Sequence, residues 1–234
     1  MEEELKKQIK EAYLVFNLNM LNKDGDSLMC SLNKTFGESF KVGHNCLGCN
    51  LNEDVEFIDN FLKNSIESNY FVGKLRIDYF FKPYLIHLYL LTEKILEIKK
   101  IIGLPSSYQS DKYEVFKTIK LWANFFKHPK AFILTHHPNY IFEKENLPKT
   151  KGQIFINREY LKKYYSGEDL NKYNNLMKDL SNNNDVIVCV PNIIQLTKDF
   201  CLACEDFIRI IENNNIYKEI LNDISTIEGY YKSN

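Results

Sequence analysis

The chain has 234 residues, of which 44% are hydrophobic and 26% are charged, fractions typical of a globular protein and not of a disordered one. Thirty Lys and Arg against 31 Asp and Glu give a formal net charge of −1. This balance excludes the strong basic excess of many nucleic-acid binders, although a local basic patch remains compatible with it. Aromatic residues reach 14%, so we expect a core rich in rings.

The first two predicted elements are helices. Apolar residues three and four positions apart, from Leu5 to Met20, predict a helix over residues 3–20. Asn52 and the two acidic residues after it are typical of a helix N-terminus, because a short polar side chain caps backbone N–H groups there. The helix that begins at this cap should end near Glu67.

Residues 70–102 form the longest segment with helical periodicity. We expect Pro83 to kink this helix or to divide it, because a proline within a helix lacks a backbone N–H. Gly103 and the proline two residues later end the segment. A further helix is predicted over residues 111–128.

The hydrophobic period changes after residue 130. Three short runs that are rich in β-branched or aromatic residues predict strands, which we expect to pair in one small sheet: 131–135, 153–156 and 186–190. The other predicted elements are helices near 168–181, over 192–212 after Pro191, and over 215–231.

These elements predict a mainly α fold: a helical bundle with a small β-sheet of about three short strands in the C-terminal half. We expect one domain over residues 1–234. Residues 1–130 would form the core of the bundle, 131–190 a mixed strand and helix insertion, and 191–234 the C-terminal helices that close the bundle.

No segment of the sequence is typical of a membrane protein. The N-terminus is acidic and then amphipathic, without the apolar stretch of a secretory signal. The longest charge-free apolar run, from Pro83 to Thr92, is about half of the ~20 residues that a membrane span needs. We therefore expect a cytoplasmic protein that has no membrane partner.

One helix end carries a candidate catalytic set of Lys120, Asn124 and His128. These residues lie four apart, so their side chains share one face of the predicted helix. An imidazole can exchange a proton near neutral pH, an ammonium can stabilise charge on a phosphate, and a carboxamide can orient the substrate. The set fits metal-independent cleavage of RNA through the ribose 2′-hydroxyl. The alternative is structural, because a histidine in the last turn also caps carbonyl groups.

A helix of such a bundle that reads Asn-x-x-Lys-His, here from Asn124 to His128, resembles the HEPN superfamily (higher eukaryotes and prokaryotes nucleotide-binding). The resemblance covers about residues 53–130. It implies a bacterial defence or toxin protein, a ribonuclease that uses Asn124 and His128, and a homodimer across which the site is assembled.

The arginine of the family motif is not matched, because Ala123 precedes Asn124 and the nearest upstream base is Lys120. An ammonium does not reproduce the planar fork of a guanidinium, and many HEPN-like proteins are non-catalytic. The alternative function is therefore a non-catalytic protein-interaction subunit: an accessory, sensor or neutralising partner that carries a degenerate site.

Four further residues near this helix end are candidate binding groups: Lys127, Lys130, His136 and His137. Three imidazoles within ten residues are also compatible with a metal site. Adjacent histidines on an extended segment point to opposite faces, however, so only one of them would join His128. We expect no metal here, and RNA and a protein as partners.

Two Cys-x-x-Cys pairs lie far apart in the chain and suggest a four-thiolate zinc site. The second pair, Cys201 and Cys204, falls on the apolar face of the helix predicted over 192–212, as small core residues do. We expect reduced core or loop thiols and no cofactor. Zinc at Cys46 and Cys49 is the alternative.

Overall fold

The computed structural model describes these ranges, together with a few single positions after them: residues 2–21, 29, 47–67, 77–104, 113–127, 140–142, 155–156, 186–189 and 191–223. The backbone alone is described at 2–3, 47–50, 77–79, 125–127, 140–142, 155–156, 186–189 and 222.

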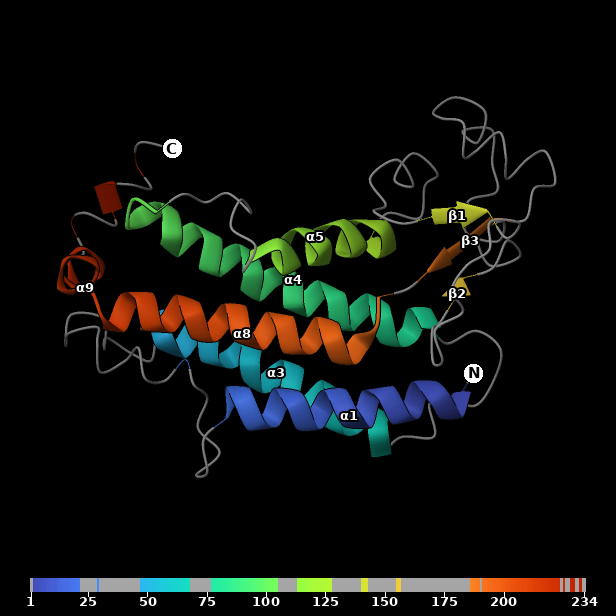
Figure 1. The fold of residues 1–234 in the computed structure, drawn as a ribbon. Coiled ribbons are helices and arrows are strands. Elements are labelled where there is room, and N and C mark those ends of the chain that lie inside the picture. Colours follow the sequence, from blue (N-terminus) through green and yellow to red (C-terminus); the bar gives the residue numbers. More distant parts are fainter. Residues whose placement is uncertain are drawn as a thin grey trace.

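Helices form the part of the fold whose side chains are described: α1 (Glu2–Met20), α3 (Leu47–Glu67), α4 (Ile77–Ile101), α5 (Glu114–Lys127), α8 (Ile193–Glu212) and α9 (Asn215–Asn222). The first five form a closed ring, because α1 contacts α3, α3 contacts α4, α4 contacts α5, α5 contacts α8, and α8 returns to α1 (Figure 1). The C-terminal helix α9 packs only on α8 among the principal contacts. The bundle is thus closed by joining distant parts of the sequence.

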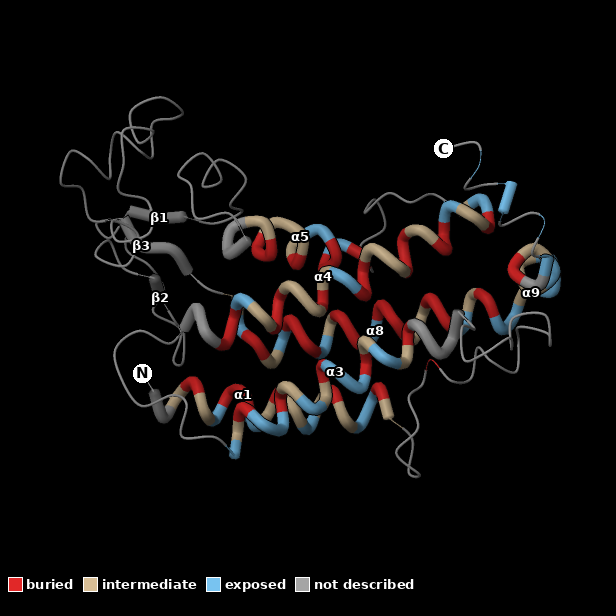
Figure 2. Tube along the Cα trace, turned by 180° about the vertical axis from the view of Figure 1, so that it is seen from behind, coloured by how far each residue is buried: buried red, intermediate tan, exposed pale blue. Residues whose placement is uncertain are grey.

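The core lies inside this ring, where the helices turn their buried faces toward one another (Figure 2). Its largest fully buried side chains are mostly aromatic: Trp122, Tyr84, Phe16, Phe80, Phe81, Phe116, Phe200 and Phe207. Phe116 of α5 meets Phe200 of α8 with ring centroids 6.0 Å apart, and Phe80 stacks on Tyr84 at 5.3 Å. The expectation of a ring-rich core is confirmed.

Hydrophobic periodicity predicted where the helices lie more accurately than it predicted the residues at which they begin and end. The helix predicted over 3–20 corresponds to α1, and the one predicted over 192–212 corresponds to α8. The predicted cap at Asn52 is wrong, because α3 begins at Leu47 and Asn52 lies in its second turn. There the Asn52 Nδ2 donates a hydrogen bond to Glu56 Oε1 at 2.6 Å, four residues on.

Pro83 does not divide α4, which runs from Ile77 through the proline to Ile101. Proline lacks only its own N–H, and its place in the second turn leaves the rest of the helical ladder intact. The predicted stop is confirmed at Gly103, whose φ of 73° lies in the left-handed region that favours glycine.

The predicted β-sheet is the part of the fold class that the structure contradicts. Where side chains are described, the chain is mainly helical and contains no strand. Outside these ranges, three backbone segments pair antiparallel in the order β1-β3-β2: β1 (Tyr140–Phe142), β2 (Phe155–Ile156) and β3 (Val186–Cys189). Segments of two to four residues make few ladder hydrogen bonds, whereas the helix faces already close a core. We therefore correct the fold class to a helical bundle.

Some predicted elements are not tested. The run 131–135 and the helix near 168–181 lie outside the described residues, and α9 as described ends at Asn222, short of the predicted residue 231. Among the described helices, none combines the length and the apolar content that crossing a bilayer requires.

Candidate functional site

The predicted catalytic set is described in part. Lys120 and Asn124 lie four residues apart on α5, and both are half-buried. Lys120 Nζ lies 3.9 Å from Glu93 Oε1 on α4. The carboxylate of Glu93 therefore offsets the positive charge that Lys120 would offer to a phosphate.

The other residues of this predicted site are not placed. Lys127 is the last residue of α5, where the backbone alone is described. His128, Lys130, His136 and His137 lie outside the described residues. The structure thus brings Lys120 and Asn124 to one helix and adds Glu93, which the sequence analysis did not consider.

The second Cys-x-x-Cys pair lies in the core of the bundle. Cys201 and Cys204 are free thiols that are 2% and 0% exposed. Burial raises the pKa of Cys201 to about 12 and the pKa of Cys204 well above its ordinary value. Their prediction as core thiols is confirmed, and the zinc alternative at Cys46 and Cys49 stays open, since Cys46 lies outside the described residues.

A groove with a volume of about 590 Å³ lies between α5 and α8. Its α5 wall consists of Glu114, Val115 and Thr118. Its other wall consists of α8 and the two residues before it: Pro191, Asn192, Gln195, Leu196, Asp199, Leu202, Ala203, Glu205, Asp206 and Arg209. Among the lining side chains that the structure describes, four are acidic and one is basic, so this lining carries a net negative charge.

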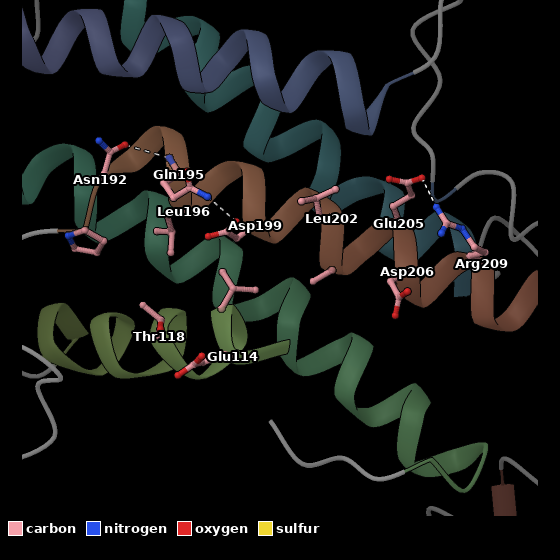
Figure 3. A pocket seen from close by; sticks show the side chains of 13 residues that line it. Glu114, Thr118, Asn192, Gln195, Leu196, Asp199, Leu202, Glu205, Asp206 and Arg209 are labelled. Atoms are coloured by element: carbon pink, nitrogen blue, oxygen red, sulfur yellow. Dashed lines mark hydrogen bonds and ion pairs between the residues drawn. The ribbon is translucent and has the colours of Figure 1, made fainter. Parts of the chain in front are cut away.

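One row of residues along α8 has a regular spacing, which we call the α8 stripe: Asn192, Gln195, Asp199, Leu202, Asp206 and Arg209. Figure 3 shows them in succession along α8, with Glu114 and Thr118 on the facing wall. Alternating steps of three and four residues keep side chains on one helix face. Leu202, at the middle of the stripe, is 51% exposed, so the stripe offers apolar surface as well as charge.

Hydrogen bonds orient the carboxylates of the groove. Asp199 Oδ1 accepts a hydrogen bond from Gln195 Nε2 at 2.7 Å, and Asp206 Oδ2 accepts one from Tyr113 Oη at 3.0 Å. The third α8 acid that lines the groove, Glu205, forms an ion pair with Arg209 at 2.6 Å. The charge of Asp199 is thus less compensated than that of Glu205.

A buried cation, Lys99, acts on Asp206. Lys99 Nζ lies 3.6 Å from the ring centroid of Tyr113, within the range of a cation–π contact. Burial lowers the pKa of Lys99, and the nearby charge of Asp206 opposes this shift. Burial, and then the hydrogen bond to Asp206, raise the pKa of Tyr113. Lys99, Tyr113 and Asp206 therefore form one coupled group that partly neutralises Asp206.

A second polar cluster lies on the α3–α4 side of the bundle. The rings of Phe57 and His87 lie 3.8 Å apart, and Phe57 is 47% exposed. Desolvation lowers the pKa of His87, although the charge of Asp54 opposes this. Asp54 is itself paired with Lys94, whose Nζ lies 2.7 Å from Asp54 Oδ2. A half-buried imidazole in this position is a structural contact between two helices.

The groove between α5 and α8 was not predicted from the sequence. Its signal was present in α8, where polar residues recur at steps of three and four between the buried phenylalanines. That pattern does not say whether a polar helix face meets water or lines a groove. Within the described residues, no three His, Cys, Asp or Glu side chains are grouped closely enough to hold a metal ion.

The comparisons with known proteins identify no relative. No protein-family model matches the chain, and neither do the curated proteins or the solved structures at a significant level.

Proposed function

We propose that the chain is a protein-interaction subunit and that the groove between α5 and α8 binds its partner. The observation that carries this proposal is the composition of the groove, which combines the exposed Leu202 with four acidic side chains. Exposed apolar surface beside polar residues is typical of interaction sites. Negative charge disfavours a polyanion such as RNA and favours a protein partner.

The order within the groove also supports a binding role. Asp199 and Asp206 are each held by a neighbouring side chain, Gln195 or Tyr113. A surface that is oriented before its partner arrives loses less side-chain entropy on binding. Binding of a partner needs no reactive group, and none of the described residues that line the groove is a histidine or a cysteine.

Site-specific photo-crosslinking in the native host tests this function. A photoreactive residue replaces Thr118 on the α5 wall, and the control replaces Lys7, whose side chain is 70% exposed on α1. We expect a covalent adduct at position 118 that protease removes and nuclease does not. An adduct with RNA, equal adducts at both positions, or no adduct at position 118 would contradict the proposal.

A second candidate function is the metal-independent ribonuclease, which the shared α5 face of Lys120 and Asn124 favours. In this proposal His128 exchanges the proton, Asn124 orients the substrate, and Lys120 or Lys127 stabilises the phosphate. The HEPN-like relationship and the homodimer that it implies belong to this proposal.

Incubation of the purified protein with tRNA in EDTA, beside a His128→Ala variant, separates the two functions. Histidine-dependent cleavage would support the ribonuclease. Because Glu93 lies 3.9 Å from Lys120, Glu93→Gln should then lower the KM for RNA by removing the competing carboxylate. Equal inertness of the wild type and His128→Ala would exclude the ribonuclease under these conditions and support the interaction subunit.

A further inference from the structure

We propose that the groove between α5 and α8 takes a basic amphipathic helix of the partner, with Asp199 as its principal electrostatic anchor. This inference rests on the proposed function and adds the chemistry and the shape of what binds.

The helical shape follows from the α8 stripe. Its six positions follow one another at steps of three and four, the spacing at which one helix packs along another. The stripe runs over nearly all of α8, which has 20 residues. A helix of that length is ~30 Å long, so a partner helix of about five turns has a matching track.

The sign of the partner's charge follows from the acids on both walls. Asp199 and Asp206 lie seven residues apart on the stripe, and Glu114 lies on the α5 wall (Figure 3). Two cations seven residues apart on a partner helix would project from one face toward these aspartates. An acidic helix would meet like charges in the same register, which is unfavourable.

Among the three α8 acids of the groove, Asp199 is the principal anchor because the other two have cations close to them. Glu205 is paired with Arg209, and Lys99 acts on Asp206. Asp199 Oδ1 accepts from the neutral amide of Gln195, which leaves its negative charge in place. A carboxylate has about four acceptor positions, so this amide does not block an ammonium or a guanidinium.

The amphipathic character follows from Leu202. It lies midway between Asp199 and Asp206 on the stripe and is 51% exposed. A partner residue that lies between the two cations would therefore cover it with an apolar side chain. The partner face that fits reads basic, apolar, basic at steps of three and four.

Peptide binding by the full chain, measured by fluorescence anisotropy, tests this inference. The probes are three helical peptides of about 20 residues, enough to cover α8. Each has Leu at one of the two heptad positions that face the groove, and the other position is Lys in the first peptide, Gln in the second and Glu in the third. A fourth peptide has the Lys composition in scrambled order. We expect the Lys peptide to bind more tightly than the other three.

Variants of the groove identify the anchor. We expect Asp199→Asn and Leu202→Ala each to weaken binding of the Lys peptide about tenfold, and Asp199→Lys to shift the preference to the Glu peptide. Asp199→Asn and Leu202→Ala each have a matched control outside the groove. Glu212→Gln removes an exposed acid of α8, and Leu14→Ala removes a leucine that is 50% exposed on α1. Neither control should change binding. Fluorescence of the buried Trp122, the single tryptophan, reports that each variant is folded.

The inference is overturned if the Gln, Glu or scrambled peptide binds as tightly as the Lys peptide, or if Asp199→Asn has no more effect than Glu212→Gln. It is also overturned if the Lys peptide does not bind. If any of these results is found together with a protein adduct at position 118 in the crosslinking experiment, the proposal of a basic partner helix is wrong and the proposed interaction function stands. If that adduct is absent as well, both proposals fail.

Discussion

Tyr84 of α4 and Thr197 of α8 form a buried hydrogen bond between two helices, with 2.5 Å between Tyr84 Oη and Thr197 Oγ1. The threonine hydroxyl donates its proton to Ile193 O at 2.6 Å, so the tyrosine must be the donor in the first bond. The two partners are therefore not equivalent. Removing the tyrosine hydroxyl leaves Thr197 with a partner, whereas removing the threonine hydroxyl leaves Tyr84 with a buried, unmatched donor.

We expect Thr197→Val to lower the free energy of unfolding by about 1–3 kcal/mol, and Tyr84→Phe to lower it by about 1 kcal/mol. Urea denaturation followed by Trp122 fluorescence measures both values. A larger loss for Tyr84→Phe than for Thr197→Val would show that the donor assignment is wrong.

His87 makes the stability of the fold depend on pH. Desolvation lowers its pKa in the folded chain below the ordinary value of 6.5, so the folded state binds its proton less readily than the unfolded state does. As the pH falls below 6.5, His87 is therefore protonated more in the unfolded chain than in the folded chain. The free energy of unfolding falls with the pH in this range, until the pH reaches the folded pKa of His87.

We expect His87→Gln to lose less stability than the wild type between about pH 8 and pH 5, because it lacks this titration. Parallel urea denaturation curves at the two pH values measure the difference. Asp54, whose charge acts on the imidazole, and Lys94, which pairs with Asp54, both remain in His87→Gln. Identical losses for the two proteins would contradict the assignment.

Local capping side chains determine where some helices begin, and tertiary packing determines where others begin. Asn192 caps α8 because its Oδ1 accepts a hydrogen bond from Gln195 N at 3.1 Å, and Asn214 caps α9 in the same way. These signals are local and were readable in the sequence, as Pro191 indicated for α8. The start of α3 was not, because Asn52 resembles a cap and yet lies inside the helix. Packing of α3 on α1 and α4 outweighs such a weak local preference.

We expect Asn192→Ala to lower the free energy of unfolding by about 1 kcal/mol, because a backbone N–H of α8 loses its acceptor. Asn192→Asp retains an acceptor and should have little effect. At the other end of α8, the C-cap residue Asn213 uses its backbone N–H, which donates to Arg209 O at 3.1 Å. Asn213→Ala is therefore the matched control. If Asn213→Ala lowers the free energy of unfolding as much as Asn192→Ala does, the Asn192 side chain is not what stabilises this helix end.

At the scale of the whole molecule, α8 connects the two sides of the ring, since it contacts both α1 and α5. Its core face carries Cys201 and Cys204, which are buried and whose thiols have raised pKa values. A thiol reagent reacts with the thiolate and needs access to the sulfur. Both conditions require that the bundle open.

We expect these two cysteines to react with a thiol reagent only when the bundle unfolds, so that the free energy of opening from labelling equals that from Trp122 fluorescence. Pulsed labelling over a urea series, with mass spectrometry of the tryptic peptide 199–209, measures it. Rapid labelling without urea, at a rate independent of denaturant, would show instead that α8 detaches from the ring separately.

The sequence by itself determined the helices, because the three- and four-residue spacing of large apolar side chains is a local property of a helix face. It also determined the aromatic character of the core and the burial of Cys201 and Cys204. It did not determine the β-sheet, because a short apolar run satisfies a strand pattern without enough length to form a layer. For the candidate site, the common helix of Lys120 and Asn124 was predicted from spacing, but Glu93 beside Lys120 was not.

Only the tertiary structure decided which polar faces meet. Glu114 and Asp199 are 85 residues apart in the chain, and they share a groove because the ring closes between α5 and α8. In the same way, Lys99 and Asp206 become electrostatic neighbours through Tyr113. Hydrophobic periodicity specifies the side that a helix buries, but it is non-directional and does not select the neighbouring helix. The negative charge of the groove is therefore a property of the assembled bundle.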